Sequence, residues 1–357
     1  MKYFLSRMAI STFMRLSLNE RWIFDKPKLI QQIDTWESQL HHIKPYYAIK
    51  SNPSEEMIQT LYERNVGFDV ASKKEIMLAK KYSKDIIFTN PHINRHEDIS
   101  YLKDTLFKVV DSIEEITKLK DVDVLIRTNS CIESANCNFD SKFGCSQKEA
   151  FDIIKYARSC NLKVRGISFH IGSGGIHNRK VAYLKAYAYA EPLLEYLATQ
   201  YDERPILDIG GGLLPQTNLL ETLGWTKYLP YSIIAEPGRY FSEPSYHLLT
   251  QIISKTKRGI FLDNGIYHEL NVYHRDHWSF PLLTHCYDEE TNQLTEITQY
   301  EIIKIFGPTC DSYDTLNECK LPQQLKEGDY IFLENMGAYT SAGSCDFNGI
   351  VAASSKN

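Results

Sequence analysis

Residues with chemically useful side chains stand directly after short apolar runs in the first 240 residues. Lys50 follows Tyr47-Ala48-Ile49, and a carboxylate, Glu236, ends another run. Glycine-rich turns follow two more runs, at Gly172-Ser173-Gly174-Gly175 and Gly210-Gly211-Gly212. A lysine amine can form a Schiff base, and a carboxylate can pair with a protonated ring nitrogen. Turns without Cβ atoms let backbone N–H groups approach a phosphate.

The elements that must position these residues alternate along the chain. Eight apolar runs have strand character, at 44–49, 66–70, 85–88, 107–110, 122–126, 165–169, 205–209 and 231–234. Segments with helical spacing lie between them, such as Met57, Ile58, Leu61 and Tyr62. Eight alternations favour a parallel (β/α)₈ barrel over an open doubly wound sheet. We therefore predict an α/β fold in which the polar residues after the strands meet at one mouth.

The pattern changes near residue 245. Four later runs, at 248–253, 259–262, 300–305 and 329–333, have strand character without long helical segments between them. Chain termini often lie close together, so the first residues could add a strand to this second domain. The predicted organisation is an N-terminal segment at 1–25 that adds to the β domain, a barrel at 26–245 and a C-terminal β domain at 246–357.

Composition narrows the class of protein. The 357 residues include 40 Lys and Arg against 45 Asp and Glu, a formal net charge of -5, so we expect no nucleic-acid partner. The eight cysteines are dispersed and form no Cys-x-x-Cys pair, which predicts reduced thiols and no metal site. No run of 18 apolar residues and no signal-peptide pattern occurs. We expect a cytoplasmic protein without a membrane partner.

The lysine, the glycine turns and the carboxylate together match what pyridoxal 5'-phosphate (PLP) requires. Lys50 would hold the aldehyde, and Glu236 would pair with the ring nitrogen so that the ring can accept electrons. Glycine-rich turns after the seventh and eighth strands stand where barrels of this kind bind phosphate. His170, at a strand end among glycines, could stack on the ring.

Seven motifs resemble the fold type III PLP-dependent decarboxylases of basic amino acids, a family with an alanine racemase-like barrel and β domain. The motifs follow in order over residues 22 to 350, and they match the ornithine decarboxylase branch best. They are Tyr47-Ala48-Ile49-Lys50, Phe68-Asp69-x-Ala71-Ser72-x-x-Glu75-Ile76, Ser168-Phe169-His170-x-Gly172-Ser173-Gly174, Asp208-x-Gly210-Gly211-Gly212, Glu236-Pro237-Gly238-Arg239-Tyr240, Gly307-Pro308-Thr309-Cys310-Asp311 and Glu334-Asn335-Met336-Gly337-Ala338-Tyr339-Thr340.

The resemblance implies a role for each matching residue. Lys50, His170 and Cys310 would be catalytic, and Cys310 would protonate the carbanion left by loss of CO₂. Family members are homodimers in which Cys310 and Asp311 of one chain complete the site of the other. The implied cofactor-binding residues are Lys50, Asp69, Arg127, His170, Ser173, Gly210, Gly211, Gly212, Glu236, Gly238, Arg239 and Tyr339.

The resemblance also implies which residues select the substrate. Asp276 and Asp311 would face the terminal amine, and Tyr267 and Phe347 would lie near the substrate entrance or the dimer interface. Arg275 departs from the family pattern, because a tyrosine usually precedes this aspartate. An aspartate rather than a glutamate at 276 favours ornithine, which would give putrescine for polyamine biosynthesis.

Three alternatives remain open. Lysine or arginine could be the substrate on the same scaffold, because one methylene of pocket length discriminates by only about 1–3 kcal/mol. A catalytically silent regulator similar to the antizyme inhibitors should have lost cofactor residues, yet Lys50, His170, Glu236 and Cys310 are all present. An alanine racemase-like activity is disfavoured by Cys310 in its decarboxylase motif.

Overall fold

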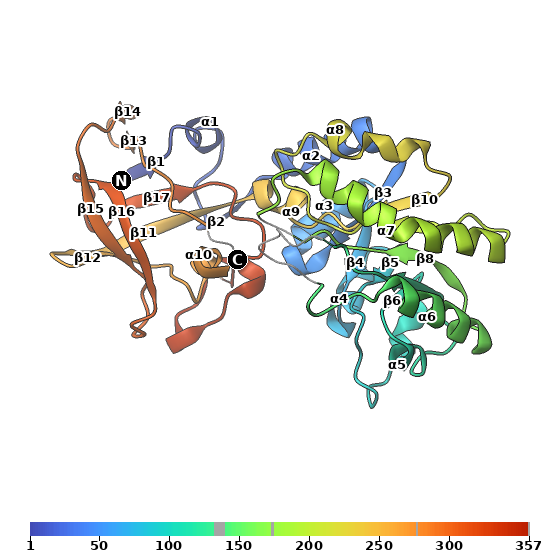
Figure 1. The fold of residues 1–357 in the computed structure, drawn as a ribbon. Helices are drawn as coiled ribbons and strands as arrows, with labels where there is room; N and C mark the ends of the chain where they lie inside the picture. Colours follow the sequence, from blue (N-terminus) through green and yellow to red (C-terminus); the bar gives the residue numbers. More distant parts are fainter. Residues whose placement is uncertain (132–139, 173–174, 276–277, 356–357) are drawn as a thin grey trace. The chain divides into compact units, whose positions relative to one another are not determined.

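A closed barrel of eight parallel strands forms the larger part of the chain (Figure 1). The computed structural model describes residues 1–131, 140–172, 175–275 and 278–355. In the barrel the strand order is β10-β3-β4-β5-β6-β7-β8-β9. The strands are β3 (Ile43–Ala48), β4 (Gly67–Val70), β5 (Ile86–Phe88), β6 (Lys108–Val110), β7 (Val124–Arg127), β8 (Val164–Ser168), β9 (Ile206–Asp208) and β10 (Ser232–Ala235). Each begins and ends within two residues of a predicted run, and the predicted fold class is confirmed.

Helices alternate with these strands. They are α2 (Lys26–Leu40), α3 (Glu55–Glu63), α4 (Lys73–Ala79), α5 (Ile113–Ile116), α6 (Gln147–Ser159), α7 (Arg179–Gln200), α8 (Leu219–Leu223) and α9 (Arg239–Ser242), with the 3₁₀ turns η1 (Ile49–Ser51), η2 (Ser100–Asp104), η3 (Gly224–Tyr228) and η4 (Glu243–Ser245). Helix α6 begins where Ser146 and Glu149 form a reciprocal capping box. The barrel interior is filled by a cluster of Tyr46, Ile87, Phe107, Val109, Leu125 and Ile234.

A second unit is built around one mixed sheet. The chain separates into two compact units, Ile30–Phe241 and the combination of Met1–Leu29 with Ser242–Asn357. The sheet order is β14-β13-β1-β17-β11-β12-β15-β16, with β2 paired to β11. Its strands are β1 (Lys2–Leu5), β2 (Trp22–Phe24), β11 (Tyr246–Thr256), β12 (Gly259–Leu262), β13 (His285–Asp288), β14 (Gln293–Glu296), β15 (Tyr300–Phe306), β16 (Thr315–Pro322) and β17 (Tyr330–Leu333). The predicted division at residues 25 and 245 stays a prediction.

Short helices complete this second unit. They are α1 (Ile10–Phe13) and α10 (Val272–Arg275), with the 3₁₀ turns η5 (Glu269–Asn271), η6 (Ser341–Gly343), η7 (Phe347–Gly349) and η8 (Ala353–Ser355). The sequence did not predict β13, β14 or β16, which carry exposed polar residues and lack a continuous apolar run. Within the described ranges, no helix combines the length and apolar character that a membrane crossing needs.

Asp25 ties the N-terminal segment to the second unit. The carboxyl group is fully buried and accepts hydrogen bonds from Arg15 and from His247 of β11. Burial alone would raise the pKa of Asp25, but the hydrogen bonds from His247 and Arg15 hold it well below its usual range. Asp25 is therefore ionised in the folded protein, and its buried charge depends on both hydrogen-bond partners.

Lys108 is a fully buried cation in β6 of the barrel. Its ammonium donates hydrogen bonds to the carbonyl oxygens of Asn90, Pro91 and Val109 at 3.2, 2.6 and 3.1 Å. The Glu115 carboxylate lies 4.0 Å from the Lys108 ammonium and also forms an ion pair with Lys118. Burial lowers the pKa of Lys108 to about 8, against the partly opposing charges of Glu115 and Asp111.

Replacing Lys108 with Met should change how stability depends on pH. Because the folded pKa lies below the ordinary lysine value, the unfolded chain binds more protons between about pH 8 and 10.5, so the free energy of unfolding of the native protein should rise with pH over that range by roughly 3 kcal/mol. This rise should be missing in Lys108→Met. Urea unfolding at pH 7.5 and 10 measures it, with exposed Lys185→Met as the matched control. Equal pH slopes in the native protein and Lys108→Met would show that Lys108 titrates normally.

Candidate active site

Lys50 lies at the carboxyl end of β3, within the 3₁₀ turn η1. Its Nζ atom is 3.4 Å from Oδ2 of Asp69, whose side chain is only 1% exposed. The hydroxyl of Thr89, which follows β5, donates a hydrogen bond to the other oxygen of Asp69. Asp69 is thus held from both sides, and one of its oxygens faces the Lys50 amine.

Two further carboxyl groups, Asp208 and Glu236, are buried at the same end of the barrel. Asp208 accepts hydrogen bonds from the Ser168 hydroxyl at 3.0 Å and from the Gly210 N–H at 2.9 Å. Burial raises the pKa of Glu236 well above its usual value, and the charges of Asp208 and Asp69 raise it further. Burial also raises the pKa of Asp208, which is hydrogen-bonded to Glu236. Because two buried like charges cannot both ionise cheaply, loss of the last proton from this pair is disfavoured.

His170 follows β8 and presents a neutral ring. Its Nδ1 atom accepts a hydrogen bond from the Gly172 N–H at 2.9 Å, so the ring proton is on Nε2. Burial, together with the positive charges of Arg127 and Lys50, holds the pKa of His170 well below its usual value. A Cβ atom at Gly211 would lie 2.9 Å from Nε2 of His170, so only glycine fits beside this ring.

The carbonyl oxygens of the turn Gly210-Gly211-Gly212 are each held by a hydrogen bond. The carbonyl oxygen of Gly210 accepts a hydrogen bond from the Glu236 N–H at 2.8 Å. Helix α7 holds the next two carbonyls, because the Tyr183 hydroxyl donates to Gly211 at 2.7 Å and Arg179 Nε donates to Gly212 at 3.0 Å.

In a trans peptide the C=O and the following N–H point in opposite directions, so the next N–H groups are turned away from α7 and β10. Across the described ranges, no protein acceptor takes the N–H of Gly211 or Gly212. Gly210 and Gly212 have φ angles of +64° and +102°, which favour glycine. The turn is therefore a set of available donors of the kind that binds phosphate.

Arg179 and Tyr183 were missed in the sequence. They stand four residues apart at the start of α7, on one face of the helix. This spacing alone does not show that they contact the glycine turn, because the carbonyl oxygens to which they donate have no sequence signature. Asp208, which belongs to the carboxyl cluster, and Thr89, which donates to Asp69, were likewise not among the predicted site residues.

The other predicted barrel residues also surround this end. The Arg127 guanidinium lies over the Phe143 ring, 5.1 Å from its centroid. A Cβ atom at Gly238 would be 3.1 Å from Cβ of Ser51, so Gly238 lets its loop pack against the turn that carries Lys50. Arg239 begins α9 immediately after this loop. Ser173, which was predicted to bind phosphate, lies outside the described residues.

Four predicted residues come together in the second unit. The Tyr267 hydroxyl donates a hydrogen bond to Oδ2 of Asp311, and the Tyr267 ring stacks on Phe347 with centroids 4.3 Å apart. The N–H of exposed Cys310 donates to Oδ1 of Asn348 at 2.9 Å. The hydrogen bond from Tyr267 lowers the pKa of Asp311 and raises that of Tyr267 to about 12. Asp311 is therefore a half-buried carboxylate that directly follows exposed Cys310 in the chain.

Arg275, whose direction was open from the sequence, donates from Nη1 to the carbonyl oxygen of Tyr339 at 2.8 Å. Tyr339 has a φ angle of +62°, which is uncommon for a residue with a side chain. The guanidinium therefore braces the segment in which Tyr339 takes this unusual conformation. Asp276, the predicted second acid for the substrate amine, lies outside the described residues.

These groups fit PLP. The barrel supplies an amine, a buried carboxyl group with a raised pKa, a neutral ring beside a glycine, and a turn in which the N–H groups of Gly211 and Gly212 have no protein acceptor among the described residues. This combination defines a PLP-dependent enzyme on a (β/α)₈ barrel.

Comparison with known proteins gives the family. Residues 26–243 match the family described as "Pyridoxal-dependent decarboxylase, pyridoxal binding domain", and the chain belongs to this family. The chain is 31% identical over 381 residues to the chloroplastic ornithine decarboxylase of Nicotiana glauca. The alignment covers 97% of this chain and 87% of that protein.

Solved structures agree with this family. The arginine decarboxylase of Paramecium bursaria Chlorella virus bound to agmatine matches with a TM-score of 0.82 and 26% identity, over 96% of this chain and 98% of that one. The lysine/ornithine decarboxylase of Vibrio vulnificus complexed with putrescine matches with a TM-score of 0.79 and 26% identity, over 97% and 96%. The predicted cofactor and enzyme class are confirmed: the protein is a PLP-dependent decarboxylase. The roles of individual residues stay predictions.

Replacing Asp208 with Asn should weaken the pH dependence that comes from the shared proton. A carboxyl group whose folded pKa is raised stabilises the fold at low pH, and this contribution is lost as pH rises through the folded pKa. For Glu236 the loss is about 1.4 kcal/mol per pH unit. Urea unfolding of the cofactor-free protein at pH 5.5 and 8.5 should show a smaller loss in Asp208→Asn, with exposed Asp202→Asn unchanged. An unaltered loss in Asp208→Asn would mean that the two carboxyl groups do not share a proton.

Proposed function

We propose that this protein decarboxylates L-ornithine to putrescine, a reaction of polyamine biosynthesis. The observation that carries the proposal is the half-buried Asp311 carboxylate, which Tyr267 holds and which follows exposed Cys310 in the chain. An acid that can bind a terminal ammonium thus adjoins a group that can deliver a proton. The names of relatives at about 30% identity support ornithine as the substrate.

The barrel residues have separate tasks in the proposed mechanism. When bound, PLP supplies an electron sink for the electron pair that is released when CO₂ leaves Cα. Lys50 would hold the aldehyde of the cofactor, and Asp69 lies 3.4 Å from the Lys50 amine and orients it. Glu236 would pair with the ring nitrogen and keep a proton there. His170 offers a neutral ring as a flat support, because a charged ring here would oppose Lys50 and Arg127.

The phosphate group would be held by backbone and side-chain donors. Gly211 and Gly212 would supply N–H groups, whose direction Tyr183 and Arg179 fix through the carbonyl oxygens. Gly210, whose N–H is bound to Asp208, would shape the turn beside the phosphate. Gly238, Arg239 and Ser173 complete this part of the proposed site. Tyr339 is proposed to add a hydroxyl donor, and Arg275 braces its backbone.

We further propose that two copies assemble into a homodimer with shared active sites. Cys310 and Asp311 of one copy would act at the barrel of the other, together with Asp276, Tyr267 and Phe347. The carbanion at Cα would take its proton from the Cys310 thiol, and the terminal ammonium would pair with Asp311. The proposed compartment is the cytoplasm, which is supported by the free thiols of the seven described cysteines.

Lysine is the second candidate substrate, because a solved relative at 26% identity is named a lysine/ornithine decarboxylase. Arginine follows from the viral relative in the same way. A silent regulator is disfavoured, because Lys50 with Asp69 and the Asp208–Glu236 pair keep the arrangement that the cofactor needs.

The substrate is tested by product analysis of the PLP-loaded protein given ornithine, lysine and arginine separately. We expect putrescine as the main product, with kcat/KM for ornithine exceeding that for lysine by about 10- to 200-fold, the range that one methylene provides. Lys50→Ala is the inactive control. Preferential release of cadaverine or agmatine would contradict the ornithine assignment.

The shared site is tested by mixing two inactive variants. Lys50→Ala and Cys310→Ala damage different chains of the proposed site, so an equal mixture that exchanges subunits should regain about a quarter of native activity, from the one intact site in each mixed dimer. Each variant alone should release almost no putrescine. A mixture that stays inactive after confirmed subunit exchange would place Cys310 and Lys50 in the same chain's site.

A further inference from the structure

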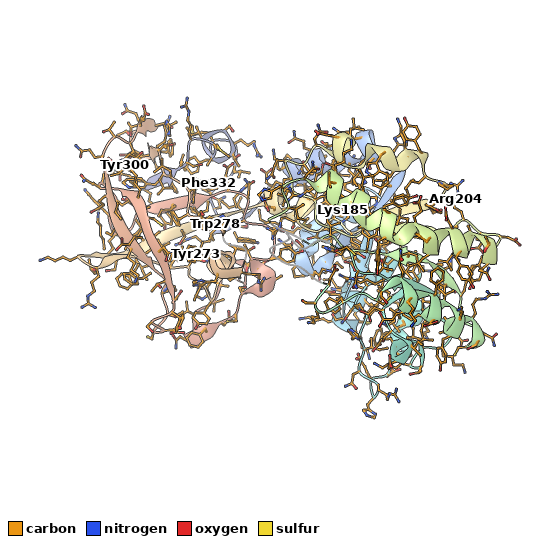
Figure 2. The ribbon with its side chains drawn as sticks, in the orientation of Figure 1. Lys185, Arg204, Tyr273, Trp278, Tyr300 and Phe332 are labelled. Atoms are coloured by element: carbon orange, nitrogen blue, oxygen red, sulfur yellow. The ribbon has the colours of Figure 1, made fainter. Side chains whose placement is uncertain are left out.

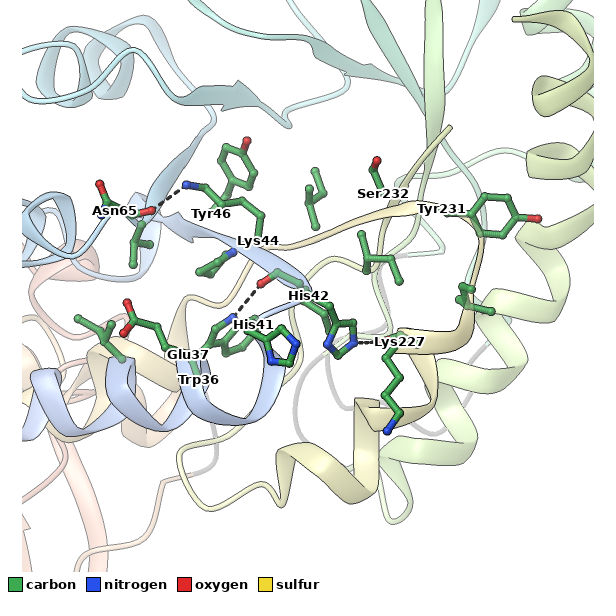
Figure 3. A pocket seen from close by; sticks show the side chains of 18 of the residues that line it. Trp36, Glu37, His41, His42, Lys44, Tyr46, Asn65, Lys227, Tyr231 and Ser232 are labelled. Carbon is green, nitrogen blue, oxygen red and sulfur yellow. Dashed lines mark hydrogen bonds between the residues drawn. The ribbon is translucent and has the colours of Figure 1, made fainter. Parts of the chain in front are cut away.

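A cavity of about 630 Å³ opens at the amino ends of the barrel strands. It is lined by the start of β3, the start of β10 and the residues that precede β4, and Figure 3 shows it from close by. The strands are parallel, so this end of the barrel is opposite the end that carries Lys50 and Glu236. The volume lies within the range of small-molecule sites.

The floor of this cavity is apolar and partly aromatic. The buried rings of Trp36 and Phe241, 1% and 0% exposed, lie beneath it 5.8 Å apart. The Trp36 indole is fixed by a hydrogen bond from Nε1 to the Ile43 carbonyl oxygen at 3.1 Å. These rings belong to the packed core, so the apolar surface that a ligand can reach comes from half-buried lining side chains such as Pro45 and Leu229.

The rim of the cavity collects positive charge. Lys44, Arg64, Arg204 and Lys227 line it together with His41 and His42, and Glu37 is the one acidic residue of the lining. Figure 3 shows Lys227 close to the two histidines. This sign is opposite to that of the whole chain, whose formal net charge is -5.

Two of these cations are not neutralised by neighbours. Lys44 is paired with Asp85 at 2.9 Å, and Arg64 with Asp34 and Glu37. Within the part of the chain that the structure describes, no carboxylate forms an ion pair with Arg204 or Lys227. Arg204, labelled in Figure 2, is exposed in the segment between α7 and β9, and Lys227 is exposed in η3.

The surroundings of His42 show that the rim is positively charged. Its Nε2 atom lies 2.8 Å from the hydroxyl of buried Thr226, and that hydroxyl donates to the Leu223 carbonyl oxygen, so His42 is the donor in this pair. Burial lowers the pKa of His42, and the charges of His41 and Lys227 lower it further. The surroundings therefore disfavour an additional cation and favour an anion.

We propose that this cavity is a second ligand site, which binds a small organic anion whose phosphate or carboxylate group pairs with Arg204 and Lys227 while its apolar body lies against Pro45 and Leu229. The site lies within the barrel unit and does not depend on the proposed substrate. Its ligand would thus be separate from both the amino acid and the cofactor.

Calorimetric titration of the PLP-loaded enzyme with phenyl phosphate, benzoate and inorganic phosphate tests this site. Loading with PLP keeps the probes out of the proposed phosphate turn. We expect saturable binding of phenyl phosphate or benzoate, weaker binding of inorganic phosphate, and a loss of about tenfold or more in affinity for the double variant Arg204→Ala, Lys227→Ala. Tighter binding of phenyl phosphate than of benzoate would identify a phosphate ester as the natural ligand class. Tighter binding of benzoate would identify a carboxylate.

Two further variants keep the test decisive. Lys155→Ala with Lys185→Ala removes two exposed lysines of α6 and α7 and should bind the probes as the native enzyme does. Ser232→Trp places a large ring at the cavity rim and should abolish binding without changing charge. All variants should retain decarboxylase activity, which verifies their folding. Absence of binding to the native enzyme at millimolar concentrations, or unchanged binding in both the double variant and Ser232→Trp, would overturn the proposal.

Discussion

Three carboxyl groups and one ammonium group share the carboxyl end of the barrel, and their charges must be reconciled there. Asp208, Glu236, Lys50 and Asp69 come from β9, β10, β3 and β4, which are consecutive neighbours in the closed barrel. All three carboxyl groups are buried, where an unpaired charge costs several kcal/mol. Lys50 offsets one charge and a retained proton offsets another. The site is therefore short of positive charge and suited to a cationic ring.

The strand ends were the part of this site that the sequence could predict. Lys50, Asp69, His170 and Glu236 each follow an apolar run, and parallel strands bring such positions to one edge. The closed barrel and the cofactor followed from that regularity. Boundaries were right to within two residues, because apolar runs of this kind are buried on both faces.

Contacts between distant elements could not be predicted in the same way. Arg179 and Tyr183 act on carbonyl oxygens of a turn about thirty residues away, and a carbonyl has no sequence signature. The direction of Arg275 was undetermined for the same reason, since it also binds a carbonyl oxygen. Strands β13, β14 and β16 lack a continuous apolar run; β13 and β14 pair with each other as a hairpin, and β16 pairs with β15. These features depend on the fold and not on local pattern.

The two ends of the barrel have opposite chemical characters. Carboxyl groups are concentrated at the carboxyl ends of β4, β9 and β10, and lysine, arginine and histidine side chains gather at the amino ends of β3 and β10. A single set of parallel strands thus presents an acidic, proton-holding face and a basic face. Such a division keeps the carboxyl cluster of one end of the barrel apart from the cationic lining of the cavity at the other.

The pairing of β1 with β17 sets the order in which the protein can fold on the ribosome. Tyr3 pairs with Tyr330, so the first strand is made long before its neighbour exists. At typical synthesis rates the delay is roughly 20 to 60 s, whereas the barrel segment can fold as soon as it has emerged. During this interval the apolar face of β1 and its unpaired backbone groups are exposed to other chains. The nascent protein is therefore most dependent on chaperones at its first strand, although that strand is well buried in the finished fold.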